Sequence, residues 1–497
     1  MTIITITALL LALAIYTMVG LYLSSRTKGI ADLLPFGISS HARVNTPSEF
    51  SASTVATTIS LATVVMAFFE LAQRLGVWLF WTVITTSAGL FVVRLFAKKI
   101  WQKLSVYDHR PTLHEFLGTE FNSRILSYVG AICTSLGFLF AFAVELTVGS
   151  KFFAGLVPNV PAWIVVIILS VVAFAYTAMG GFRAVIVTDK IQMLSIWLLL
   201  LALPAFYLVF IFSHGGWVEN FSKIPAGTLN FSYTEGLTAF LLGIFVINVP
   251  TFISDMSIWQ RIAGAQKNQT VIGGLWSSIF TSVTTWGLFA ILACFVFMII
   301  KPEQGVNPLV SLLNVISNSG GLFAGSVLFF AVLGLYGAML STASTQLIAV
   351  SHTLYEDVFS HIRKPTFQQR LESKKELGIS RLILILSAVL STLLVQLLSS
   401  AGFSIADLVF AVYGAQLGLC PLVIAALVLK RERLKFLSGW ATLAISTGFI
   451  TGWGSALFGR FSGNTNMVFL APVFSLIISS TLLGIGLLTE KNSQPKS

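Results

Sequence analysis

Residues 193–212 read MLSIWLLLLALPAFYLVFIF, a stretch of twenty positions without a charged side chain. A helix that crosses the hydrocarbon core of a bilayer needs about 20 mostly apolar residues. Further uncharged blocks lie at 9–22, 164–174, 280–300 and 322–340. Of the 497 residues, 56% are hydrophobic and only 10% are charged, whereas a soluble domain carries roughly a quarter charged residues. The pattern is not the alternation of a barrel, so the chain is expected to be an all-α polytopic membrane protein.

The hydrophobic pattern predicts thirteen transmembrane spans. They lie at about 3–23, 50–71, 76–96, 126–149, 161–178, 189–212, 237–258, 271–300, 322–354, 380–399, 405–429, 437–457 and 467–488. The charged loop at about 355–379 is too short to form a separate domain, and no glycine-rich nucleotide loop is found. Any energy for transport is therefore expected to come from an ion gradient rather than from ATP.

The net charge of +11 is explained by membrane topology. With the N-terminus placed outside, 25 of the 30 Lys and Arg residues fall on the inner side. The five on the outer side are Arg74, Lys151, Lys223, Lys301 and Arg460. This asymmetry follows the positive-inside rule, so we expect an outside N-terminus, a cytoplasmic C-terminus and no nucleic-acid partner. No basic residue precedes the first span, which argues against a signal peptide.

Two spans carry features that weaken a helix. Asn248, Val249 and Pro250 interrupt the span at 237–258, and proline removes a helix hydrogen bond. The run SASTVATTIS at 51–60 contains many hydroxyl and β-branched side chains, which are poor helix formers. Two discontinuous helices, one in each inverted repeat, form the binding site of many transporters. A proline kink and a helix interface of small residues explain the same residues equally well.

Four segments, in order, carry a resemblance to a known family. They are Thr112–Leu117 with Phe121–Arg124, then GGFRAVIVTDKIQ at 180–192, WQRIA at 259–263, and GAMLSTASTQL at 337–347, which is followed by Tyr355–Asp357. Together they resemble the sodium/solute symporter family, whose members include sodium/proline, sodium/glucose and sodium/sialic acid transporters.

The resemblance implies a LeuT-like fold with a five-plus-five inverted-repeat core. Residues 1–49 would hold a first peripheral helix and an inner loop. Residues 50–430 would form the core, and residues 431–497 would form the last two peripheral helices and the tail of a single transmembrane domain.

The resemblance also implies a sodium site, since hard cations prefer oxygen ligands. Ser341 and Thr342 offer two adjacent hydroxyls, and Ala338 lies one turn earlier on the same helix face. In the family, two carbonyls of a broken helix complete the site, and they map onto Ala56 and Ile59. Where some relatives carry an aspartate, this chain has Thr58. From the residues alone, a packing face of small side chains is the simpler interpretation.

Acidic residues within membrane spans are costly and are functional candidates. The family resemblance connects Asp189 with sodium coupling or a second ion, while helix capping is the alternative. Glu145 is a candidate substrate contact, against hydrogen bonding to a neighbouring helix or pairing with Lys151. Asp255 is expected to act as a gate or to pair with Arg261.

Other polar and aromatic residues complete the predicted site. Gln416 aligns loosely with a substrate-binding glutamine of sugar-transporting relatives, with helix–helix hydrogen bonding as the alternative. Thr58 and Ser60 are predicted substrate contacts, and Phe68 and Trp259 are predicted gate aromatics.

The expected function is symport of sodium with a small polar organic solute by alternating access, in the cytoplasmic membrane of a bacterium and as a monomer. A transporter-like sensor and a proton-coupled transporter are the alternatives. The six histidines lie at span ends or in loops and form no ligand-spaced cluster with acids, and the three cysteines fall within spans. We therefore expect no enzyme activity, no cofactor and no transition metal. The acidic Glu145 disfavours a carboxylate clamp, so a neutral, zwitterionic or amine-bearing solute is expected.

Overall fold

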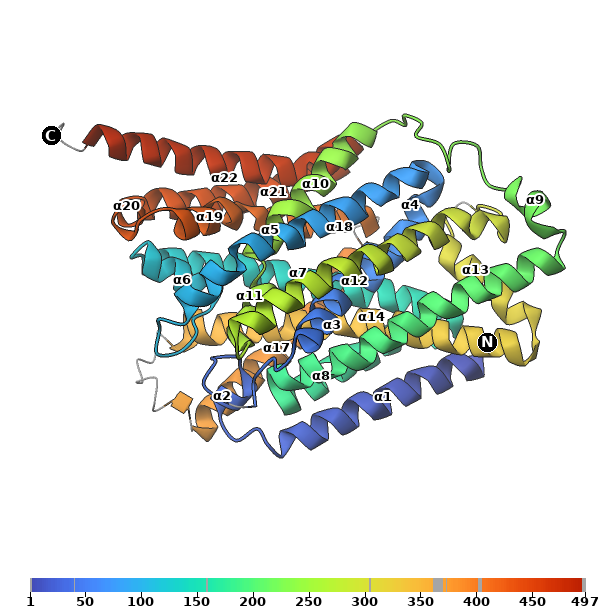
Figure 1. Cartoon of the computed structure of the whole chain (residues 1–497), viewed down its shortest axis with the longest axis horizontal. Helices are drawn as coiled ribbons and strands as arrows, with labels where there is room; N and C mark the ends of the chain where they lie inside the picture. Colours follow the sequence, from blue (N-terminus) through green and yellow to red (C-terminus); the bar gives the residue numbers. More distant parts are fainter. Residues whose placement is uncertain are drawn as a thin grey trace.

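The computed structural model describes residues 2–39, 41–157, 160–303, 305–360, 370–371, 373–400 and 405–493. Within these ranges the fold is helical, and most of the long helices run along one axis of the molecule (Figure 1). Eleven helices of the described part are long and apolar enough to cross a membrane. The all-α membrane fold is thereby confirmed, and the number of thirteen spans stays a prediction.

The helices that surround the site come from both halves of the chain. They are α3 (Pro47–Thr58), the π-helical η1 (Leu61–Met66) with α4 (Ala67–Leu75), α5 (Phe80–Leu104), α7 (Arg124–Leu156), α8 (Ala162–Ser213), α10 (Leu237–Ser254), α11 (Met256–Gly264), α12 (Asn268–Phe295), α14 (Gly321–Thr353) and α18 (Ile405–Gln416). Outside them lie α1 (Thr2–Ser24), α17 (Lys374–Ser400), α21 (Ser438–Phe461) and α22 (Thr465–Ser493).

The α8 run of 52 residues is too long for one crossing, because a helix rises about 1.5 Å per residue. It changes direction at Gly181, whose φ is 61°. A side chain there would adopt a strained backbone conformation and would meet the carbonyl oxygen of Leu33 at 2.4 Å. Only glycine suits this turn, which explains Gly181 in the second segment.

The first helix interruption lies between α3 and η1. Thr46 caps α3 by accepting a hydrogen bond from the amide of Glu49, and α3 ends at Thr58. Ile59 and Ser60 leave the helical conformation, and the Ser60 hydroxyl then accepts from the amide of Thr63 at 2.8 Å. The hydroxyl-rich run therefore forms a discontinuous helix, as one of the two interpretations of the sequence predicted.

The second interruption lies later than predicted. Pro250 sits inside α10, which continues to Ser254, so the prediction of a break at Asn248–Pro250 is wrong. The break falls at Asp255, whose carboxylate accepts from the amide of Ser257 at 2.7 Å and starts α11. Aspartate is a strong N-cap, whereas membrane helices tolerate proline where neighbouring groups satisfy the backbone.

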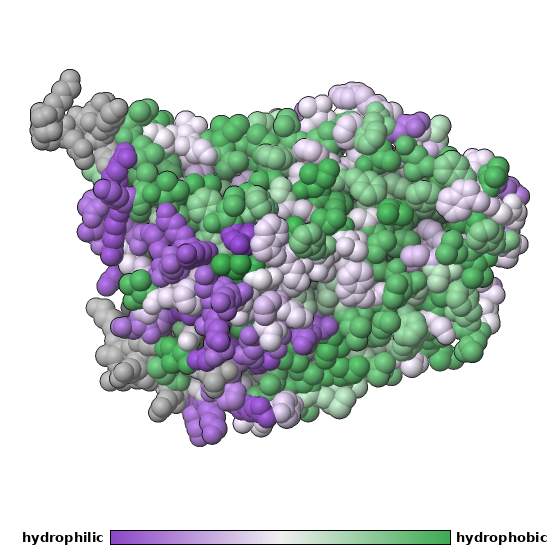
Figure 2. All heavy atoms as spheres, in the orientation of Figure 1, coloured by the Kyte–Doolittle hydropathy of each residue, from purple (hydrophilic) through white to green (hydrophobic). Residues whose placement is uncertain are grey.

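The hydrophilic surface gathers at one end of the molecule (Figure 2). The elements at that end include α2 (Ile30–Leu33), α6 (Leu113–Glu120) and α20 (Arg431–Phe436) (Figure 1). Several basic residues belong to these elements or their neighbours, including Lys103, Arg431 and Arg433. We call this region the basic end.

Candidate functional site

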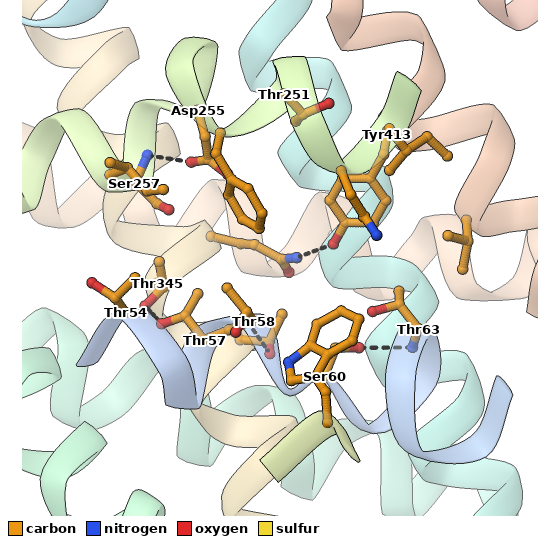
Figure 3. Close-up of a pocket in the computed structure, with 18 of the residues that line it drawn as sticks. Thr54, Thr57, Thr58, Ser60, Thr63, Thr251, Asp255, Ser257, Thr345 and Tyr413 are labelled. Carbon is orange, nitrogen blue, oxygen red and sulfur yellow. Dashed lines mark hydrogen bonds between the residues drawn. The ribbon is translucent and has the colours of Figure 1, made fainter. Parts of the chain in front are cut away.

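A cavity of about 120 Å³ lies between the two helix interruptions (Figure 3). One side carries α3 and η1, and the facing side carries α10 and α11, while α5, α7, α12, α14 and α18 contribute the rest of the wall. The volume is several times the roughly 30 Å³ that a water molecule occupies in the liquid, so it suits a small solute. Its polar lining includes Thr54, Thr57, Thr58, Ser60, Thr63, Thr82, Asn248, Thr251, Asp255, Ser257, Arg261, Thr342, Thr345, Gln346 and Tyr413.

The residues of the predicted sodium site lie where α3 ends beside α14. The Thr342 hydroxyl donates to the Thr57 carbonyl at 3.0 Å and to the Ala338 carbonyl at 3.3 Å. Ala56, Ile59 and Ala338 are fully buried. The last carbonyls of a helix lack amide partners, and at the end of α3 the Thr57 carbonyl accepts from the Thr342 hydroxyl of α14. The geometry thus gathers oxygen atoms in a dry environment.

Asp189 brings a third helix to the same place. Its carboxylate accepts from the Ser341 hydroxyl at 2.7 Å, and also from the Ser53 hydroxyl. The side chain is completely buried. Capping was the alternative role, but Asp189 lies well inside α8. A negative charge therefore stands one hydrogen bond away from the predicted sodium ligands.

Arg261 of α11 is also buried in this network. Its Nη2 lies 3.5 Å from the Asp189 carboxylate and donates to Thr57 at 2.6 Å and to Thr345 at 3.1 Å. Its Nε donates to the Ser53 hydroxyl at 2.8 Å. The sequence suggested a pair between Arg261 and Asp255, whereas the ion pair in the structure joins Arg261 to Asp189. The second and third sequence segments therefore meet at this network.

Glu145 of α7 lies behind the discontinuous helix and is not among the residues that line the cavity. Its carboxylate accepts a hydrogen bond from the Ser60 hydroxyl and faces the amides of Leu61 and Ala62. The other oxygen, Oε2, is buried without a hydrogen-bond partner in the described structure. Glu145 therefore sits at the amino end of the run that continues from η1 into α4.

The predicted gate residues take different positions. Phe68 lines the cavity and packs edge-on against Trp286, with 5.8 Å between the ring centroids. Trp259 is buried, and its indole donates to the Ile253 carbonyl at 2.8 Å. Asp255 lines the cavity from the break itself. Trp259 thus satisfies a carbonyl at the end of α10, which stabilises the second interruption.

Thr58 and Ser60, two of the predicted substrate contacts, line the cavity, while Gln416 does not. Gln416 packs against Gly137 of α7. The sequence did not single out Tyr413 or Gln346 as site residues, but both line the cavity and hydrogen-bond to each other at 3.5 Å. Gln346 lies in the quoted segment at 337–347, which was the available signal, whereas Tyr413 lies in none of the quoted segments.

The remaining parts of the segments hold the basic end together. Arg183 forms a bidentate ion pair with Glu49, at 2.7 and 2.8 Å, and fixes the turn of α8 to the start of α3. Thr112 donates to Asp357 at 2.8 Å, which joins the first segment to the end of the fourth. Motif residues therefore serve the scaffold as well as the site.

A histidine and two glutamates do meet at the basic end, so the prediction of no such cluster is wrong. One ligand atom each from His109, Glu115 and Glu356 lies within 4.8 Å of the others. Arg370 pairs with Glu356 at 2.8 Å. Burial lowers the pKa of His109, but the hydrogen bond and charge of Glu115 and the charge of Glu356 outweigh it and raise the pKa above its ordinary value. His109 and Glu115 are neighbours in the sequence, but Glu356 is distant from both, which hid the cluster.

Comparisons with known proteins agree with this architecture. The sodium:solute symporter family matches residues 43–435. The high-affinity proline transporter of Bacillus subtilis is 22% identical over 86% of this chain and 85% of its own length. The sodium/sialic acid symporter of Proteus mirabilis is 24% identical over 74% of both chains.

Solved structures match as well. A sodium-coupled sialic acid symporter in a substrate-bound outward-open state superposes with a TM-score of 0.74 at 19% identity, covering 98% of this chain and 97% of that one. A nucleobase-cation-symport transporter with bound bromovinylhydantoin superposes with a TM-score of 0.58 at 13% identity, covering 92% and 95%.

The chain is a multi-pass membrane transporter with a LeuT-like fold. It belongs to the sodium:solute symporter family.

Proposed function

We propose that the protein imports a small polar organic solute together with one sodium ion, which Ala56, Ile59, Ala338, Ser341 and Thr342 bind. The observation that carries this proposal is the meeting of the α3 end with Ser341 and Thr342, beside the buried carboxylate of Asp189. Hard cations prefer such oxygen-lined, dehydrated positions. Asp189 compensates the charge of the ion through Ser341 and couples its binding to the rest of the network.

The solute binds in the cavity between the two helix interruptions, where Thr58 and Ser60 contact it and Phe68 closes over it. Discontinuous helices form the substrate site of many secondary transporters. Glu145 acts on this site indirectly, through the Ser60 hydroxyl, and Gln416 acts through packing against α7. Asp255 and Trp259 control the second interruption. The protein acts as a monomer without a cofactor and catalyses no reaction.

The basic end faces the cytoplasm in this proposal, with the N-terminus outside and the C-terminus inside a bacterial cytoplasmic membrane. The uneven distribution of Lys and Arg and the hydrophilic end of the molecule support this orientation (Figure 2). Labelling of terminal cysteine tags from each side of intact cells tests it: only the N-terminal tag should react from outside. A reactive C-terminal tag would reverse the orientation.

A sodium titration of the heat-unfolding midpoint, with potassium as reference, tests the sodium site. A ligand that binds only the folded state stabilises it by about 2.7 kcal/mol at 100 times its dissociation constant. We expect a sodium-specific rise in the wild type and in Thr353→Ala, which removes a buried hydroxyl without a hydrogen-bond partner elsewhere on α14. The rise should be lost in Ser341→Ala with Thr342→Ala. If sodium does not change the unfolding midpoint of the wild type, the result would instead favour a proton-coupled transporter or a sensor.

A further inference from the structure

Two charged side chains line the described part of the cavity wall, Asp255 and Arg261. Arg261 forms an ion pair with Asp189 and donates hydrogen bonds to the hydroxyls around it. Asp255 forms no ion pair within the described chain, and its carboxylate accepts from the amide of Ser257 at 2.7 Å and faces the amide of Ile258. Figure 3 shows Asp255 projecting from the second interruption on the side of the cavity that faces Thr57 and Thr58. The cavity therefore presents a carboxylate that forms no direct ion pair with a cation of the described chain.

The opposite wall, at the first interruption, offers no site for an anionic group of the solute. The amino end of a discontinuous helix commonly receives the anionic group of a substrate. In this protein the carboxylate of Glu145 already lies at the amino end of the 61–75 run, where it accepts from Ser60 and faces the amides of Leu61 and Ala62. A solute carboxylate at this end would meet the carboxyl group of Glu145 rather than free amides.

The formal charges around the cavity lead to the same conclusion. Arg261 forms its ion pair with Asp189, so the carboxylate of Asp255 is in excess over the cations that contact the described cavity wall directly. Charge that is not compensated within a membrane is costly. An ammonium group on the solute would neutralise the excess, whereas a carboxylate would increase it. Aromatic side chains, Phe68, Phe252 and Tyr413, line the same cavity, and aromatic faces attract cations.

We propose that the transported solute carries a protonated amine and no carboxylate, and that Asp255 binds its ammonium group. This inference rests on the proposed solute site between the two interruptions, and it narrows the expected solute class, since it excludes zwitterions such as amino acids. It also gives Asp255 a direct role in binding in addition to its capping of α11.

Small amines test this assignment by their effect on the unfolding midpoint. We expect ethanolamine or choline, in sodium buffer, to raise the midpoint of the wild type, and glycine, proline and acetate to leave it unchanged. Asp255→Asn should lose the amine-dependent rise, because asparagine keeps the capping oxygen but not the charge. Asp407→Asn, which lies outside the cavity lining, should keep it. An amine response that survives in Asp255→Asn would overturn the proposal, as would a response to glycine, proline or acetate.

The sodium response of the same variants separates this proposal from the proposed sodium site. Asp255→Asn should keep the sodium-specific rise. Loss of the sodium rise with the amine response intact would assign Asp255 to the ion and overturn the ammonium assignment. If amines raise the unfolding midpoint of the wild type equally in potassium and in sodium, Asp255 would still be the residue that binds the ammonium group. The proposed sodium site would then be wrong.

A tethered ammonium tests the cavity without knowledge of the solute. Thr251 lines the cavity four residues before Asp255 and points into the same space (Figure 3). Thr251→Lys should unfold at a higher temperature than Thr251→Glu, because the lysine can pair with Asp255. The advantage of lysine should disappear when Asp255→Asn is also present. Equal midpoints for the two variants, or an advantage that persists without Asp255, would overturn the proposal.

Discussion

The two helix interruptions face each other across one cavity, yet they are built differently. The first, between α3 and η1, leaves helical geometry over Ile59 and Ser60, and its neighbourhood is rich in uncharged oxygens. The second breaks at the single residue Asp255 and carries the charges of Asp255 and Arg261. Uncharged oxygens suit a sodium ion that must also leave, while fixed charges set which solute charge is accepted. The comparison suggests that ion binding and solute selection reside on opposite walls.

The largest expected effect comes from the charged wall. Arg261→Met leaves the buried carboxylate of Asp189 without its cation, and breaking a buried ion pair costs about 3–5 kcal/mol. The heat-unfolding midpoint of the purified protein should fall sharply. Adding Asp189→Asn should restore much of the loss, because the uncompensated charge is then gone. If the double variant unfolds as early as Arg261→Met, Arg261 stabilises the fold mainly through its hydroxyl partners.

The first interruption should respond less strongly. Ser60→Ala removes the cap of η1 and the hydroxyl that donates to Glu145. A buried acceptor left without its donor costs about 1–3 kcal/mol. Ser60→Ala combined with Glu145→Met should not add the two separate losses, because either change alone removes the same hydrogen bond. Full additivity in the unfolding midpoints would show that Ser60 and Glu145 are energetically independent.

A smaller effect is expected from the cap at the second interruption. Asp255→Ala removes the acceptor for the Ser257 amide, and loss of an N-cap costs about 1 kcal/mol. Asp255→Asn and Asp255→Ser keep a capping oxygen and should unfold close to the wild type. Equal destabilisation of all three variants would mean that the charge of Asp255, rather than its capping, stabilises the folded state.

The smallest effect concerns the cluster at the basic end, far from both interruptions. The pKa of His109 is raised in the folded state: burial alone would lower it, but Glu115 and Glu356 outweigh burial. A raised pKa contributes stability below the ordinary value near 6.5 and loses it as the pH rises through the folded-state value. The unfolding midpoint should therefore fall as the pH rises above about 6.5. Glu115→Gln should flatten this fall, and an unchanged slope would place its origin elsewhere.

Much of the fold could be predicted from the sequence, because membrane spans are local patterns of composition. The end of α3 was also accessible, since ten residues rich in hydroxyl and β-branched side chains are locally poor in helix propensity. The second break was placed wrongly at Pro250. Whether a proline breaks a membrane helix depends on the groups around it, and Asp255 instead caps a new helix.

Contacts between distant segments limit how much of the site could be predicted from the sequence. Arg261 was expected beside Asp255, six residues away, but it pairs with Asp189, 72 residues away. Glu356 joins His109 and Glu115 only because the first segment packs against the end of the fourth. The Glu145 side chain points toward η1 rather than into the cavity because α7 packs behind η1. None of these arrangements follows from local periodicity.

Equilibrium binding of radioactive sodium to the purified protein tests the central claim most directly. The account predicts saturable binding of one ion per chain, displaced by sodium but not by potassium. It predicts that Ser341→Ala with Thr342→Ala abolishes binding, while Thr353→Ala and Asp255→Asn preserve it. Undiminished binding in the double variant, or no saturable binding in the wild type, would contradict the placement of sodium between α3 and α14.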